Sequence, residues 1–327
     1  MKLLKDIPTK DFCSIDIETV RIKETFSELT EDYQSAWEYK NKHEGKVLNQ
    51  DELAALWERT SSFYAEFSKV CAVSLAFLNK EENNLIVKGF SNVDEKVLLE
   101  DLNSFLERIY NKGNYRLIAH AGKYFDYPYL CKRYVINDLD IPRILDTGHL
   151  KPWENKNLCT NQDIWKMGGT GAGSSLQALC TALNIPISKV DLVGDEVGTA
   201  YFNGELERIS KYCSYDTIAT FNIIRKIKKE SIFQFEEVEY LNEKESVSVT
   251  PVLERIYTSK EISDKDKEDL RKLVLVKKPN DEELEVIRDM VLNLYIQSKM
   301  FEADSKAVVK EKTNEVNELI EEICKKK

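Results

Sequence analysis

The chain has 327 residues, of which 42% are hydrophobic and 32% are charged, a composition typical of globular proteins and unlike that of collagen-like or disordered chains. Lys and Arg number 47 against 57 Asp and Glu, which gives a formal net charge of −10. This balance argues against a protein that coats nucleic acid non-specifically, because such binding needs many basic residues that displace counterions from phosphates.

The sequence gives no sign of a membrane segment or of a cysteine-based site. No apolar stretch approaches the roughly 18 residues that span a bilayer, and the first ten residues lack the apolar segment of a signal peptide. The seven cysteines form no Cys-x-x-Cys pair, and there are only three histidines, so neither a disulfide framework nor a zinc site is indicated. We expect a soluble, cytoplasmic protein with no membrane partner.

The first predicted element is a strand over 11–19, DFCSIDIET, in which Cys13, Ile15 and Ile17 alternate with polar residues. The elements expected after it are an inserted pair of helices at 31–42 and 50–63, strands at 69–78 and 84–90, a helix at 93–110 capped by Asn92 or Asp94, a strand at 116–119, a helix at 126–135, a strand at 143–146, a glycine-rich loop at 168–173 before a helix capped by Ser174 or Ser175, and an amphipathic helix at 205–228. This order predicts an α/β protein with a mixed sheet covered on its faces.

The composition changes beyond residue 228, where glycine disappears and charge density rises. Helices are predicted there at 264–276, 281–301 and 308–323. We therefore expect one domain over 1–228, with 20–66 as a helical insertion, and an α-helical C-terminal appendage over 229–327.

Two acids on the first strand, Asp16 and Glu18, are two residues apart and therefore project from one face. Like charges in a half-buried sheet are costly unless a cation neutralises them, and hard oxygen ligands suit Mg²⁺ or Mn²⁺. The alternative is a pair of solvated acids at a strand end.

A second acidic position interrupts the apolar stripe of the helix at 205–228. Tyr212 and Asp216 are four residues apart, on the same face as Ile209, Ala219 and Ile223. A carboxylate within a core-facing stripe must be paired or bind a metal. The alternative is that Asp216 caps a neighbouring loop and Tyr212 is an ordinary core aromatic.

A third acid, Asp126, follows the strand that ends at His120 and precedes a helix start that contains Pro128. By itself Asp126 is explained equally well as a helix N-cap. Together, the four acids and the tyrosine suit phosphodiester hydrolysis by two metal ions about 3.5 to 4 Å apart.

The segments SIDIET, FDYPYL and YCSYD resemble, in order and spacing, the three exonuclease motifs of the tyrosine-bearing branch of the DEDD superfamily. They are most similar to free-standing exonucleases related to the proofreading domain of family B DNA polymerases, and the similarity covers about residues 10–228. The resemblance implies a ribonuclease H-like fold, with a mixed central sheet flanked by helices.

The same resemblance implies a role for each acid. Asp16 would ligate both of two Mg²⁺ or Mn²⁺ ions, Glu18 would hold the ion that carries the nucleophilic water, and Asp126 and Asp216 would complete the cluster. Tyr212 would orient or deprotonate that water.

The second motif departs from the family pattern. Where the family usually has Asn, four or five residues before the Asp, this chain reads His120, Ala121, Gly122 and Lys123, so an amide contact to the terminal nucleotide is missing. We assign substrate contacts to Thr19, His120, Lys123 and Phe125; a solvated surface charge is the alternative for Lys123.

The implied function is a metal-dependent 3′–5′ exonuclease that acts on 3′ ends of single-stranded DNA, releases 5′-mononucleotides and serves DNA replication and repair. An RNA 3′–5′ exonuclease stays open, because the metal cluster does not inspect the sugar, and so does a catalytically weak nucleic-acid-binding module. The C-terminal helices are a candidate surface for a replication protein.

Five aromatic residues near the predicted helical insertion allow two interpretations. They either pack the inserted helices together or stack on unpaired bases, which contributes about 1 to 3 kcal/mol per base. These residues are Trp37, Trp57, Phe63, Tyr64 and Phe67.

Overall fold

The chain divides into two compact units, Met1–Glu243 and Lys244–Lys327. The computed structural model describes residues 4, 6–42, 48–79, 81–82, 84–113, 115–151, 153–171, 173–187, 192–241, 262–263, 265–267 and 270. Of the three helices predicted beyond residue 260, only positions 265–267 and 270 are described, and these are helical. The rest of those predictions lies outside the described residues.

A six-stranded sheet of mixed direction organises the first unit, as the sequence predicts. The strands lie in the order β5–β4–β1–β2–β3–β6. Their bounds are β1 Phe12–Arg21, β2 Ser68–Leu78, β3 Leu85–Ser91, β4 Arg116–Ala119, β5 Leu158–Cys159 and β6 Glu239–Tyr240. The central strand β1 pairs antiparallel with β2 and parallel with β4, and its register with β2 shifts between Glu18 and Thr19.

The described helices flank this sheet, and two of them begin at caps expected from the sequence. The helices are α2 Glu31–Lys40, α3 Gln50–Thr60, α4 Glu95–Asn111, α5 Asp126–Ile136, α6 Leu176–Leu183, α7 Val197–Phe202 and α8 Leu206–Lys228, with short turns η1 Thr9–Asp11, η2 Phe26–Glu28, η3 Ser61–Phe63, η4 Thr160–Trp165, η5 Gly194–Glu196 and η6 Phe235–Glu237. Asp94 caps α4 and Ser175 caps α6, because each side chain accepts backbone N–H groups of the first turn.

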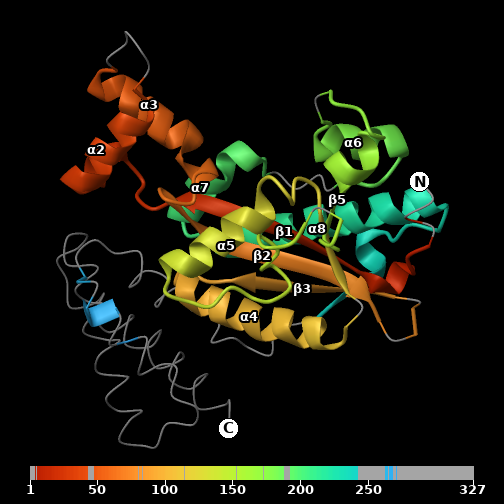
Figure 1. The fold of residues 1–327 in the computed structure, drawn as a ribbon. Helices are drawn as coiled ribbons and strands as arrows, with labels where there is room; N and C mark the ends of the chain where they lie inside the picture. Colours follow the sequence, from red (N-terminus) through yellow and green to blue (C-terminus); the bar gives the residue numbers. More distant parts are fainter. Residues whose placement is uncertain are drawn as a thin grey trace, which may run out of the picture. The chain divides into compact units, whose positions relative to one another are not determined.

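The two faces of β1 belong to different halves of the core. Cys13, Ile15 and Ile17 pack with α4 and α5 on one face, whereas Phe12 packs with α8 on the other (Figure 1). On the α8 face, the Ser14 hydroxyl donates to a backbone carbonyl of α8 over 3.0 Å. Strand alternation therefore directs Asp16 and Glu18 toward α8.

The prediction of a strand at 143–146 is wrong. Residues 143–145 form a turn, and a strand not predicted from the sequence, β5, pairs with β4 instead. Ile144 is buried although it is not in a strand, and its carbonyl accepts a hydrogen bond from the Asn157 amide over 2.7 Å. The apolar residues of this turn are thus explained by core packing rather than by sheet pairing.

The first unit continues beyond residue 228, where the sequence analysis ended the first domain. Strand β6 pairs in parallel with β3 at the edge of the sheet, so the segment after α8 is not purely helical. Two helices, α2 and α3, lie between β1 and β2 in the chain, as predicted. Their interpretation as an insertion stays a prediction.

Candidate active site

Strand β1 and helix α8 bring three potential ligands together. A carboxylate oxygen of Asp16, one of Glu18 and the Sγ atom of Cys213 all lie within 4.8 Å of one another. The Cys213 thiol also donates to the backbone carbonyl of Asp16 over 3.3 Å. This contact fixes the middle of α8 against the strand that carries both acids.

Asp126 and Asp216 complete a cluster of four carboxylates. The charge of each acts on Asp16 and on Glu18 and raises the pKa of both. Asp126 is the first residue of α5, and its carboxylate accepts a hydrogen bond from the backbone N–H of Ile17 on β1. All four acids that the sequence analysis selected thus lie close enough to interact electrostatically in the structure.

Burial is the largest cause of the raised pKa values in this cluster. It raises the pKa of Asp126 to about 7 and that of Asp216 to about 6, although hydrogen bonds to both carboxylates act in the opposite direction. For Asp16 and Glu18, burial and the neighbouring negative charges act together and raise the pKa well above the usual range. Such a cluster favours protonation or a bound cation.

The tyrosine of the third motif lies beside the fourth acid. Tyr212 is hydrogen-bonded through its hydroxyl to Asp216, and this bond lowers the Asp216 pKa in part. Burial and the charges of Asp216, Glu18 and Asp16 keep the tyrosine pKa above its usual range. Tyr212 is therefore a neutral hydrogen-bond donor at the edge of the cluster.

Comparison with known proteins agrees with this geometry. A family described as predicted 3′–5′ exonuclease related to the exonuclease domain of PolB matches residues 61–264. The chain belongs to this family. The matched range includes Asp126, Tyr212 and Asp216 but begins after β1, so it does not cover Asp16 and Glu18. No curated protein matches the chain.

Exonuclease families of this kind normally use divalent metal ions, and the residues of this chain fit such ions. Asp16 Oδ2 is buried and has no hydrogen-bond partner among the described residues. An orphaned carboxylate oxygen among three further acids matches the preference of Mg²⁺ and Mn²⁺ for hard oxygen ligands.

No described helix has the length and apolarity needed to cross a bilayer.

Cys213 is a member of the cluster that the sequence analysis missed. Burial and the charge of Asp16 raise the pKa of its thiol well above the usual range. In the metal-free protein the protonated thiol therefore donates to the backbone carbonyl of Asp16. The only sequence signal for it is its place next to Tyr212.

We predict that the metal-free exonuclease loses stability as the pH rises. Asp126 and Asp216 bind their protons more tightly in the folded protein, with pKa values of about 7 and about 6, than in the unfolded chain, where the pKa is about 4. Their contribution to the free energy of unfolding is therefore fully present below about pH 4 and is lost as the pH rises through about 6 to 7.

The difference in melting temperature between Asp126→Asn and the wild type, measured in EDTA, isolates this effect. We expect a small difference at pH 4 and a variant that is more stable by on the order of 2 kcal/mol at pH 8. Mg²⁺ should raise the melting temperature of the wild type at pH 8. A difference that does not grow with pH contradicts the prediction.

Two of the residues assigned to substrate contacts are engaged within the protein. The Thr19 hydroxyl donates to the Ser62 carbonyl over 2.9 Å. Lys123 forms an ion pair of 2.9 Å with Asp163 on η4. Their roles toward substrate stay predictions.

His120 is hydrogen-bonded to Ser174, the residue that directly follows the glycine-rich loop. Its Nε2 atom lies 2.8 Å from the Ser174 carbonyl and its Nδ1 atom 2.9 Å from the Thr160 hydroxyl. A carbonyl only accepts, so Nε2 carries the proton; burial lowers the ring pKa, so the ring is neutral and Nδ1 accepts from Thr160. With both nitrogens used, His120 is better suited to positioning this loop than to contacting a nucleotide.

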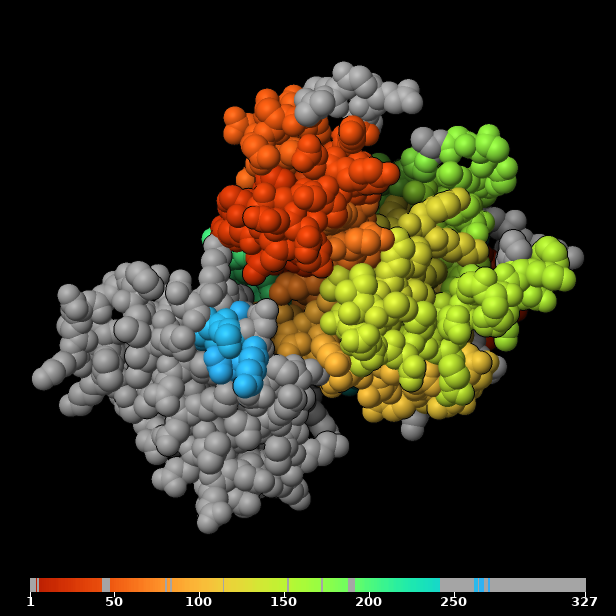
Figure 2. Space-filling view, turned by 60° about the vertical axis from the view of Figure 1, so that its left-hand side comes forward, coloured from red at the N-terminus to blue at the C-terminus, as the bar shows by residue number. Residues whose placement is uncertain are grey.

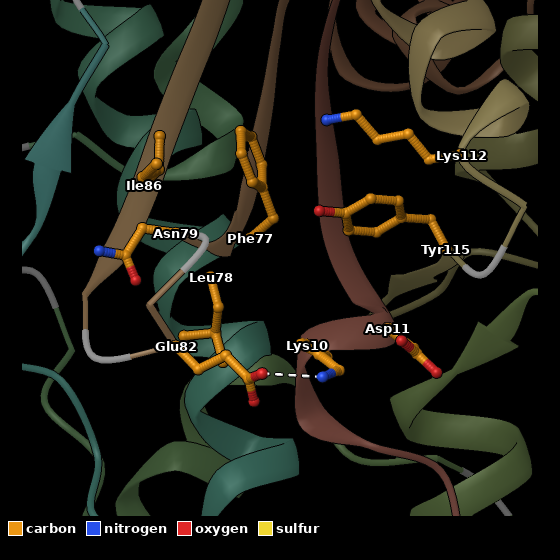
Figure 3. A pocket seen from close by; sticks show the side chains of 9 residues that line it. All are labelled: Lys10, Asp11, Phe77, Leu78, Asn79, Glu82, Ile86, Lys112 and Tyr115. Atoms are coloured by element: carbon orange, nitrogen blue, oxygen red, sulfur yellow. Dashed lines mark hydrogen bonds and ion pairs between the residues drawn. The ribbon is translucent and has the colours of Figure 1, made fainter.

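A pocket of about 400 Å³ lies at the other end of β1 from the acids. Figure 3 shows Phe77 and Tyr115 facing each other in it and an ion pair of 2.8 Å between Lys10 and Glu82 at its rim. Phe77 pairs with Cys13; on the extended strand Asp16 lies three positions further along, about 10 Å, and Glu18 five positions, about 17 Å. The charges that line this pocket are balanced and exposed, so we place the candidate active site at the carboxylate cluster instead.

Proposed function

We propose that this protein is a Mg²⁺- or Mn²⁺-dependent 3′–5′ exonuclease that acts on single-stranded DNA and releases 5′-mononucleotides. The observation that carries the proposal is the convergence of four buried carboxylates, in which the charges of Asp126 and Asp216 act on both Asp16 and Glu18. A binding module has no need of such a cluster, because the repulsion among its members destabilises the fold unless cations are bound.

The family motifs imply separate roles for the four acids and for the tyrosine. Asp16, Glu18, Asp126 and Asp216 would hold two ions, which supply Lewis-acid stabilisation of the phosphate and lower the pKa of a water molecule. Tyr212 would direct that water, through its hydroxyl, toward the phosphorus atom. The water oxygen would form a new bond to phosphorus and the P–O3′ bond would break. The 3′ oxygen would leave with the shortened strand and take up a proton, and the phosphate would stay with the released nucleotide.

The test is a digestion of labelled oligonucleotides by the full chain. With Mg²⁺, a 5′-labelled single strand should give a ladder that shortens from its 3′ end, and a 3′-labelled strand should release labelled mononucleotide at once. EDTA should stop both. Digestion from the 5′ end, or digestion that does not depend on metal, contradicts the proposal.

The same assay decides between the remaining alternatives. An RNA oligonucleotide of equal sequence, digested faster than the DNA, assigns the enzyme to RNA. Binding of either strand without metal-dependent cleavage assigns a binding module. The departure from the family pattern at Ala121 is tested in the same assay with the variant Ala121→Asn, which restores the amide that the family usually has.

Tyr212→Phe is expected to bind metal and substrate normally and to lower the turnover number by about 10²-fold, the usual contribution of a positioned proton-transfer group. The variant loses only the hydroxyl that contacts Asp216. Tyr215→Phe is the matched control, since it lies on the same helix with its ring against Phe235, 4.6 Å between centroids. Equal turnover in both variants would count against a catalytic role of Tyr212.

A further inference from the structure

The structure separates the five aromatic residues of the 37–67 segment into two groups. Trp37, Trp57 and Phe67 are buried together in one cluster under α2 and α3, so core packing accounts for them. Phe63 is 58% exposed and Tyr64 is 36% exposed. An aromatic ring as exposed as that of Phe63 gains little from the core, and it is held at a defined place.

The backbone beside Phe63 is fixed to both elements that carry the acids of the first two motifs. The Ser62 carbonyl accepts a hydrogen bond of 2.9 Å from Thr19, next to Glu18 on β1. It also accepts one of 3.1 Å from Tyr129 on α5, the helix that begins at Asp126. Turn η3 is thereby fastened between β1 and α5.

The ring of Phe63 meets a second aromatic ring at the start of α5. Phe63 and Phe125 lie edge to face, with 6.2 Å between centroids and 67° between planes. Phe125 directly precedes Asp126 and also packs against Tyr129, 5.1 Å away. Figure 2 shows the orange part of the chain, which contains η3, and the yellow part, which contains α5, on the same face.

We propose that Phe63, supported by Phe125, is a stacking platform for an unpaired base of the strand whose 3′ end enters the carboxylate cluster. The inference rests on the proposed function and adds the feature of the substrate that is recognised, an unstacked base. Stacking of one base on an aromatic side chain strengthens binding by about 5- to 150-fold. Stacking suits a protein of net negative charge, because it adds affinity without basic residues. Lys123, two residues before Phe125, is already paired with Asp163.

The platform also discriminates between strands. Bases in a duplex have both faces covered by their neighbours, whereas an unpaired base offers a free face to Phe63. Selection for a single-stranded end then follows from the ring alone, without hydrogen bonds to base edges. Sequence tolerance follows as well, because every base has a π face.

The experiment compares binding of two 5′-labelled single strands to the full chain in EDTA, read by fluorescence anisotropy. One strand is normal, and the other lacks the bases of its last three nucleotides. We expect the wild type to bind the normal strand at least about 5-fold more tightly than the abasic strand. Phe63→Leu should lose this preference by weakening only the normal strand, and Phe63→Trp should retain it.

Tyr39→Leu is the matched control, because Tyr39 is 82% exposed on α2 and takes no part in the platform. It should bind both strands as the wild type does. A Phe63→Leu variant that weakens both strands equally, or neither, overturns the inference, as does a wild type that does not distinguish the two strands. Preserved discrimination in a wild type that does not digest DNA with Mg²⁺ contradicts the proposed function and supports the platform.

Discussion

Asp16→Asn is expected to lower the turnover number of metal-dependent hydrolysis by at least about 10³-fold, because it removes a proposed metal ligand from the cluster. Asp16 is the acid whose pKa is raised by burial and by the charges of Glu18, Asp216 and Asp126 together. Loss of its charge relieves this repulsion. The metal-free variant should therefore be more stable than the wild type at pH 8, by about 1 to 2 kcal/mol.

The combination of lost activity and gained stability separates a site residue from a structural one. Turnover is measured on a labelled single strand with Mg²⁺, and stability by thermal unfolding in EDTA. Asp101→Asn is the control, because Asp101 lies on α4 and burial raises its pKa as well, but it is outside the cluster. It should leave turnover unchanged. Retained turnover in Asp16→Asn, or a loss of stability, contradicts the assignment of Asp16.

Arg133→Ala is expected to destabilise the protein by about 3 to 5 kcal/mol, because it leaves a buried negative charge without its partner. Arg133 on α5 and Glu95 at the start of α4 form an ion pair in which both side chains are less than a tenth exposed. Glu95 also accepts from the Val70 amide, and Arg133 donates to the Ala65 carbonyl over 2.6 Å. The pair ties α4, α5 and β2 together.

Chemical denaturation measures this effect, and an exposed ion pair provides the control. Arg143 and Glu107 are also paired, but the Arg143 side chain is 55% exposed, so Arg143→Ala should destabilise the protein far less than Arg133→Ala does. Replacing both buried partners, in Glu95→Gln with Arg133→Met, should recover part of the lost stability. Equal costs for Arg133→Ala and Arg143→Ala would contradict the role of burial.

Local patterns predicted the elements whose determinants lie within a few residues. The alternation in β1 and the helical spacing in α8 specify their type and exposed faces. The caps at Asp94 and Ser175 were predicted for the same reason, since a cap is a contact with the next three residues. These elements were placed to within one or two residues.

Short strands held by distant partners were not predicted. Strands β5 and β6 have two residues each, too few to show any period. They are strands because β4 and β3 pair with them. The opposite error occurred at 143–146. The apolar residues Ile144 and Leu145 predicted a strand, but they are buried in the core from within a turn.

The sequence by itself determined the identity of the acids and the face on which each pair lies. Asp16 and Glu18 share a face of any strand, and Tyr212 and Asp216 share a face of any helix. Only the tertiary structure decided which distant parts of the chain contact the other predicted site residues. His120 is bound to Ser174, 54 positions away, and Thr19 to Ser62, 43 positions away. Such contacts arise from packing between elements, which no local pattern encodes. The same packing buries Trp37 and Trp57 but leaves Phe63 exposed, with its ring against Phe125.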